Sequence, residues 1–133
     1  MRIMADNDVL GAVAVIRRML NDDEWHDLAE LVEIEFVEFA DFGLNASAPD
    51  RSVWQTCQQN EVLLITGNRT GGTDSLDAVM RELGAANDLP VTTIADPKRV
   101  LRDREYSESC TEALLDYVEI IEQLRGARRL FIP

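Results

Sequence analysis

Aspartate and asparagine residues gather after the apolar segments of this chain that have the character of buried strands. Two carboxylates follow the first such segment, one precedes a helical pattern, and two polar residues flank a glycine-rich turn after a later segment. Magnesium and manganese take oxygen ligands, and such an ion activates water and stabilises charge on a phosphodiester. The pattern indicates a candidate Mg²⁺ or Mn²⁺ site that draws on Asp6, Asp8, Asp50, Asn68 and Asp74.

Each of these residues also has a purely structural explanation. Asp50 follows Pro49 before a helical pattern, so we expect it to cap a helix. Asp74 is suited to a helix cap or a first helical turn, and Asp8 to a solvated turn. The spacing alone leaves both interpretations open.

The turn from Gly67 to Gly72 separates a strand pattern from a helix pattern. Glycines at such a junction let backbone N–H groups approach an anion, so the turn is a candidate phosphate cradle. It lacks the Gly-Lys-Ser/Thr ending of a P-loop, and the first lysine of the chain is Lys98, which argues against a nucleotide-hydrolysing P-loop. Arg69 is a candidate phosphate contact, although an exposed loop arginine is the commoner case.

Alternating strand and helix patterns must position these side chains. They predict one α/β domain over residues 1–133, with three layers and a mainly parallel sheet of about five strands flanked by helices. Such folds bind ligands at the carboxyl ends of their strands, so Asp6 and Thr66 should meet at one edge. The expected strands lie at about 2–6, 33–39, 61–66, 91–95 and 129–132.

Helical patterns fill the intervals between these strands. Apolar residues recur at helical spacing over 9–20. Asp96-Pro97 pairs a capping side chain with a proline suited to the first helical position, which predicts a helix start. A further capping signal at Ser109 predicts a break in this helix near Tyr106.

Acidic residues outnumber basic residues by 25 to 13, and the formal net charge is −12. The excess lies in the first 97 residues, which also carry the candidate site. A field of this sign repels phosphate backbones, which disfavours autonomous RNA binding, and it attracts divalent cations or a basic protein partner.

Several other classes of protein are disfavoured. No apolar run approaches the roughly 20 residues that span a bilayer, so we expect no membrane association and a cytoplasmic location. His26 is the only histidine, which argues against zinc sites that need several imidazoles. Cys57 and Cys110 are isolated on apolar helical patterns and are expected to be structural thiols.

Three segments of the chain together resemble the short PIN-like proteins of the PIN-domain nuclease superfamily. They are the opening Arg2-Ile3-Met4-Ala5-Asp6, the helix that starts at Asp50 with Val53, and the strand ending Leu64-Ile65-Thr66. The resemblance runs through about the first 85 residues. It implies a parallel sheet, a magnesium- or manganese-dependent ribonuclease, and in many members a toxin held by an antitoxin.

The resemblance also implies roles for particular residues. Asp6 matches the first metal-binding aspartate, Asp50 a second acid, and Thr66 the threonine of the later strand. Asn68 falls where the family has an aspartate, and an amide oxygen brings no charge, so metal affinity and water activation should both fall. Asp74 compensates only if the glycine-rich turn folds back.

Two functions follow as hypotheses. The first is a PIN-like metal-dependent ribonuclease, with Asp6, Asp50 and Asn68 as catalytic residues and Thr66 and Arg69 near the substrate. The second is a catalytically degenerate PIN-like domain that binds a protein or a small ligand. In either case the expected partners are a basic protein such as an antitoxin, or a second copy of the chain.

Overall fold

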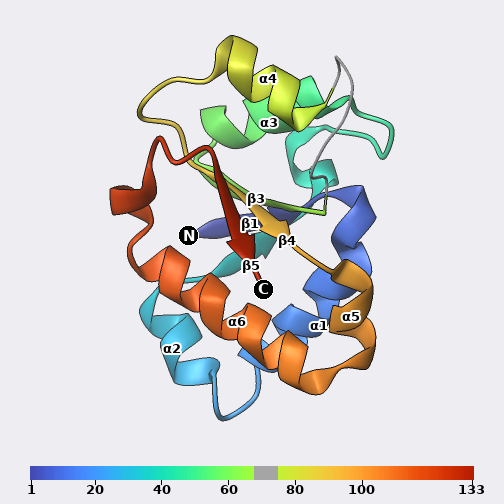
Figure 1. Cartoon of the computed structure of the whole chain (residues 1–133), viewed down its shortest axis with the longest axis vertical. Coiled ribbons are helices and arrows are strands. Elements are labelled where there is room, and N and C mark those ends of the chain that lie inside the picture. The colour runs from blue at the N-terminus through green and yellow to red at the C-terminus, as the bar shows by residue number, and fades with distance from the viewer. Residues whose placement is uncertain (68–74) are drawn as a thin grey trace.

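The computed structural model describes residues 1–67 and 75–133, so Asn68, Arg69 and Asp74 lie outside the described residues. The described chain forms a five-stranded parallel sheet in the order β2-β1-β3-β4-β5 (Figure 1). This order confirms the α/β fold and the parallel sheet that the alternating patterns predict. The strands are β1 Arg2–Ala5, β2 Glu35–Val37, β3 Val62–Thr66, β4 Val91–Ile94 and β5 Arg129–Ile132.

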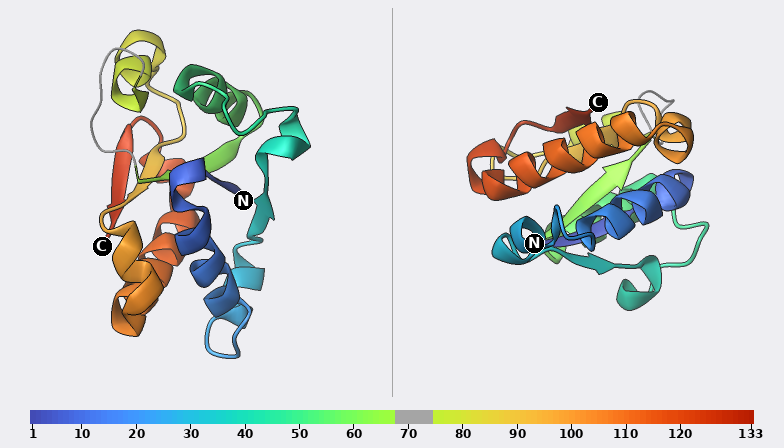
Figure 2. Two further views of the ribbon diagram at one scale, coloured as in Figure 1. Left: turned by 90° about the vertical axis from the view of Figure 1, so that its right-hand side faces the viewer. Right: turned by 90° about the horizontal axis from the view of Figure 1, so that it is seen from below.

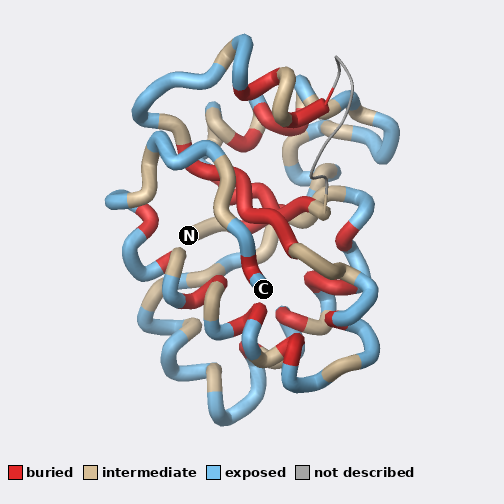
Figure 3. The backbone as a smooth tube through the Cα atoms, viewed as in Figure 1, coloured by how far each residue is buried: buried red, intermediate tan, exposed pale blue. Residues whose placement is uncertain are grey.

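Two hydrophobic cores cover the two faces of this sheet. Successive residues of a strand point to opposite faces, so Ile3 and Leu63 enter one core while Met4 and Leu64 enter the other. All residues of β3 and β4 are buried, as expected for central strands of a parallel sheet with both faces covered (Figure 3).

The helices divide unequally between the faces (Figures 1 and 2). One face carries α1 Leu10–Leu20, α2 His26–Leu31, α5 Pro97–Arg102 and α6 Arg104–Glu119. The other face carries α3 Asp50–Gln59 and α4 Leu76–Leu83, which contact each other above β3 and β4. The sheet is therefore the middle layer of three.

The last crossover of the sheet has the opposite hand from the other three. The connection from β1 to β2 through α1 and the connection from β4 to β5 through α6 lie on the same face, yet they step in opposite directions across the sheet. The connections through α3 and α4 differ from the α1 connection in two ways: they lie on the other face of the sheet, and they step across the sheet in the other direction. The two differences cancel, so these connections have the same hand as the α1 connection. Parallel crossovers are right-handed in about 98 % of cases, which makes the mixture of hands unusual.

Three sequence-based expectations about element boundaries were wrong. The edge strand spans only Glu35–Val37, because a 3₁₀ turn with a capping box begins at Phe39. The helix break lies at Asp103, whose carboxylate accepts from the Tyr106 N–H at 3.2 Å, and α6 continues through Ser109. The helix after β3 begins at Leu76 and its N-cap is Ser75, whereas the sequence had suggested Asp74 for the cap or the first turn.

The two cysteines are buried free thiols on α3 and α6, as predicted. Burial raises the pKa of Cys57 to about 12 and that of Cys110 to about 11. Both thiols therefore stay protonated at neutral pH, which suits a packing role. Within residues 1–67 and 75–133, no helix has the length and apolar character needed to cross a membrane.

The central strand β3 should dominate stability. Leu63 of β3 is fully buried in the core that α1 and α6 cover, so Leu63→Ala should lower the free energy of unfolding by about 2–5 kcal/mol. Leu31 is 78 % exposed, and Leu31→Ala should change the free energy of unfolding by less than about 0.5 kcal/mol. Urea denaturation of both variants measures the difference, and equal losses would contradict this account of the core.

Candidate acidic site at the carboxyl edge of the sheet

Asp6 is held at the carboxyl end of β1 by the neighbouring end of β3. Its backbone N–H donates to the Ile65 carbonyl at 2.8 Å, which continues the parallel pairing of the two strands. Its Oδ1 accepts from the Asn7 N–H at 2.8 Å, so Asp6 caps the short 3₁₀ turn Asn7–Val9. The Thr66 hydroxyl donates to its Oδ2 at 3.1 Å. Both carboxylate oxygens are thus oriented, and Asp6 meets Thr66 as the strand order requires.

Asp8 closes the same edge through the backbone of Gly67. The Gly67 N–H donates to Asp8 Oδ2 at 3.1 Å. A Cβ at Gly67 would lie 3.0 Å from this oxygen and 3.0 Å from Pro97 Cγ, at the start of α5. The close approach of three elements therefore favours glycine at this position, and it brings the Asp8 carboxylate against the end of β3.

Asp50 belongs to this site through its charge. The helix α3 begins at Asp50 and Pro49 is its N-cap, so the expectation that Asp50 caps the helix was wrong. Asp50 lies instead in the first helical turn, where the positive end of the helix dipole favours a carboxylate. Its negative charge is among the groups that raise the pKa of Asp6, which places it within electrostatic reach.

The pKa of Asp6 is raised above the ordinary aspartate value. Burial is the largest cause, and the negative charges of Asp8 and Asp50 act in the same direction. The hydrogen bonds from the Asn7 N–H and the Thr66 hydroxyl stabilise the ionised form and offset part of the shift. A bound proton or a bound cation therefore relieves the repulsion at this edge.

The spacing of the carboxylates suits a hydrated ion better than a closed cage. Among the described residues, the only trio of ligand atoms within 4.8 Å of one another belongs to His26, Asp27 and Glu30, which are exposed on α2. The site of Asp6, Asp8 and Asp50 is wider. Mg²⁺ commonly keeps several waters and binds one or two carboxylates directly, so this donor set fits it.

Asp96 is a further carboxylate at this edge that we did not predict as a site residue. It follows β4 by two positions, which is the same signal that identified Asp6 after β1. It caps α5 as predicted, because its Oδ1 accepts from the Arg99 N–H at 3.2 Å. Its backbone N–H donates to the Tyr106 hydroxyl at 2.9 Å, which ties the start of α5 to α6.

The described structure thus brings Asp6, Asp8 and Thr66 together, with Asp50 close enough to act on Asp6 electrostatically. The roles predicted for Asn68, Arg69 and Asp74 fall on positions outside the described residues. Comparison with known proteins finds no family model, no curated protein and no solved structure that matches this chain.

The raised pKa of Asp6 has a consequence for stability. The native state holds its Asp6 proton more tightly than the unfolded state, so stability is lost as pH rises from the ordinary aspartate pKa of about 3.9 through the raised native value. Asp6→Asn keeps the shape without the charge, and should be more stable than the wild type above this window.

Urea denaturation of both proteins between pH 4 and pH 8 measures this effect. The advantage of Asp6→Asn should grow with pH and then level off. Asp23→Asn, in an exposed turn, serves as the control and should show no such growth. Parallel stability curves for wild type and Asp6→Asn would show that Asp6 titrates normally.

Proposed function

We propose that this protein is a PIN-like metal-dependent endoribonuclease whose site is the acidic edge formed by Asp6, Asp8 and Asp50. One observation carries the proposal: a half-buried aspartate at the end of a central strand has its pKa raised chiefly by burial, and the negative charges of two further carboxylates add to the shift. Carboxylates that are held close together despite burial and mutual repulsion are typical of cation sites. The resemblance of the strand ends to PIN-like proteins supports the same function.

Asp6, Asp8 and Asp50 would hold the Mg²⁺ or Mn²⁺ ion, which when bound would activate water and stabilise charge on the phosphodiester. The chain's own residues prepare this site. Thr66 and the Asn7 N–H fix the orientation of the Asp6 carboxylate, and the Gly67 N–H fixes that of Asp8. Asp6 must release its proton to accept a cation, so metal affinity should rise with pH.

The charge of the chain bears on substrate and partner. A protein of net charge −12 repels RNA in solution, so a substrate would be engaged chiefly through the bound cation. The same charge is complementary to a basic protein, and a basic antitoxin covering the acidic edge would neutralise it. We therefore include a toxin and antitoxin pair in this proposal.

The alternative is a catalytically degenerate PIN-like domain that binds a protein or a ligand. Two observations favour it. The carboxylates of Asp6, Asp8 and Asp50 do not converge within 4.8 Å in the described structure. Asn68 supplies an amide where the resemblance implies a charge. Both features weaken metal binding, and the two experiments below separate the hypotheses.

A divalent cation should stabilise the native protein by binding to this edge. Binding to the native state alone adds about 1.4 kcal/mol of stability when the free Mn²⁺ concentration is ten times Kd. The melting temperature of the wild type should therefore rise on titration with MnCl₂, more steeply at pH 8 than at pH 5. Asp6→Asn should abolish the response and Asp23→Asn should retain it. A response that survives in Asp6→Asn would place the ion elsewhere.

RNA cleavage decides between the two functions. Asn68→Asp adds the carboxylate that the resemblance implies, so cleavage of labelled single-stranded RNA in Mn²⁺ should rise about tenfold or more, equivalent to about 1.4 kcal/mol of transition-state stabilisation. Asp6→Asn controls for contaminating nuclease. If neither the wild type nor Asn68→Asp cuts more than Asp6→Asn, the binding module becomes the better interpretation.

A further inference from the structure

Two adjoining hollows lie at the end of the sheet opposite to Asp6, where β4 and β5 begin. The α3 and α4 layer, together with the segments that precede these strands, encloses a cavity of about 240 Å³. An adjoining hollow of about 420 Å³ lies between α4 and the start of β5, and shares Met80 and Arg128 with the cavity. Trp54, Ala85, Ala86 and Leu89 give the cavity an apolar wall.

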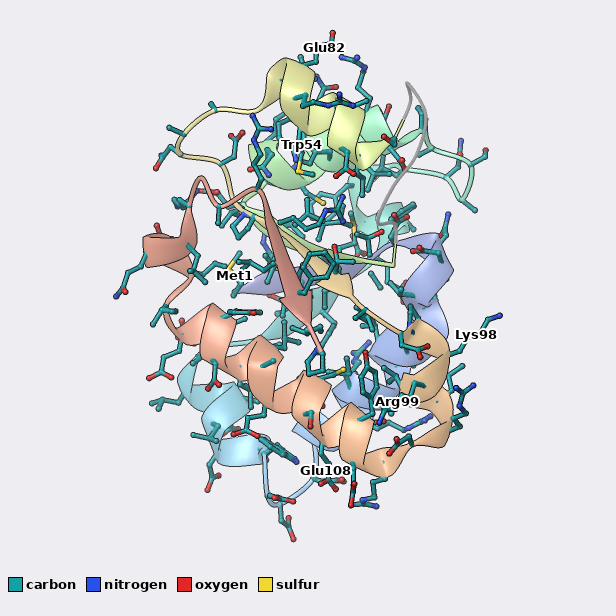
Figure 4. The ribbon with its side chains drawn as sticks, viewed as in Figure 1. Met1, Trp54, Glu82, Lys98, Arg99 and Glu108 are labelled. Carbon is teal, nitrogen blue, oxygen red and sulfur yellow. The ribbon has the colours of Figure 1, made fainter. Side chains whose placement is uncertain are left out.

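Trp54, which lines this cavity, has an unpaired hydrogen-bond donor. Its side chain lies in the α3 and α4 layer (Figure 4) and is only 4 % exposed. Within the described residues, its buried indole N–H has no hydrogen-bond partner. Buried polar groups are nearly always paired in native proteins, so this donor is an unusual feature of the residue that lines the cavity.

Two arginines that form no ion pair with the described residues line the adjoining hollow. Arg81 on α4 and Arg128 before β5 are both exposed, and neither guanidinium forms an ion pair with the described residues. Two carboxylates also line the hollows: Asp77 Oδ1 pairs with Arg129 at 2.6 Å, and Asp88 Oδ2 accepts from the Ala85 N–H at 2.6 Å. Arg81 makes one long hydrogen bond, from its Nε to the Asp77 carbonyl oxygen at 3.5 Å, so both guanidinium groups keep N–H donors for a ligand.

The backbone keeps this cavity in shape. Gly126 has φ +86°, and a Cβ there would lie 2.4 Å from the Ala86 carbonyl oxygen, so only glycine allows the two segments to approach. Arg128 also has a positive φ, 64°, which is uncommon for a residue with a side chain. The Val91 N–H donates to the Arg128 carbonyl at 2.7 Å, which fixes the backbone of Arg128 beside the start of β4.

We propose that this cavity binds a small organic anion, with a flat apolar body against Trp54 and a carboxylate or phosphate group on Arg81 and Arg128. Guanidinium groups pair with either oxyanion through two parallel hydrogen bonds. The two hollows together fall within the volume range of about 300–1,000 Å³ that is usual for small-molecule sites. The site lies at the opposite edge of the sheet from Asp6, so it is separable from metal binding there.

The indole N–H of Trp54 offers a direct readout. The chain has two tryptophans, and Trp25→Phe leaves Trp54 as the single indole signal in a ¹H–¹⁵N spectrum. Four probes should be titrated into this protein: phenyl phosphate, benzoate, the neutral benzamide and inorganic phosphate. A shift of the Trp54 signal that saturates with phenyl phosphate or benzoate is expected, and the tighter of the two identifies the preferred acid group.

Variants test the charge requirement. Arg128→Gln and Arg81→Gln should each weaken binding of the preferred anion about tenfold, while Arg18→Gln, an exposed arginine on α1, should leave it unchanged. The proposal is overturned if neither anion gives a saturable shift up to about 10 mM, if benzamide binds equally well, or if Arg18→Gln weakens binding as much as Arg128→Gln. Mn²⁺ binding at the acidic edge should be unaffected by any of these variants.

Discussion

The parallel pairing of β1 with β3 is the constraint on which the rest of this structure depends. These strands lie side by side between two cores, and their register sets Ala5 opposite Ile65. The Asp6 N–H then continues the pairing to the Ile65 carbonyl, which leaves the Asp6 carboxylate beside the Thr66 hydroxyl. A one-residue slip would exchange the side chains of a strand between the two cores and separate these groups, so the core and the acidic edge are specified by the same register.

The route of the chain around this pair explains why the two edges of the sheet differ. The chain leaves β1 on one side to form β2 and returns to the other side to form β3, so the carboxyl ends of β1 and β3 lie at a switch point, where open α/β folds usually bind ligands. The last crossover then sends α6 onto the face already occupied by α1. Beside β5, the α3 and α4 face therefore lacks the helix that a crossover of the usual hand would place there, and the hollows near Trp54 and Arg128 lie on this less covered side.

Local patterns in the sequence predict much of the fold, because buried strands and capped helices leave short-range signals. The apolar runs identify β3 and β5, the Asp96-Pro97 pair identifies the start of α5, and parallel strands imply that Asp6 and Thr66 meet. Features that depend on tertiary contacts could not be predicted from these local patterns. The capping signal at Ser109 does not start a new helix, because α6 packs as one helix against α1. The break in the helix lies at Asp103 instead. The choice of face for α6 runs against the usual crossover rule, and the cavity at Trp54 depends on that choice.

Charge separates the two edges as clearly as topology does. At the carboxyl edge, burial and neighbouring carboxylates raise the pKa of Asp6, so the native state carries an electrostatic cost that a cation would relieve. At the amino edge, Arg81 and Arg128 remain without ion-pair partners among the described residues, although acidic residues outnumber basic ones by 25 to 13. The same sheet therefore presents a site suited to cations at one end and a site suited to anions at the other. The helix α3 connects the two sites, because it begins at Asp50 and carries Trp54.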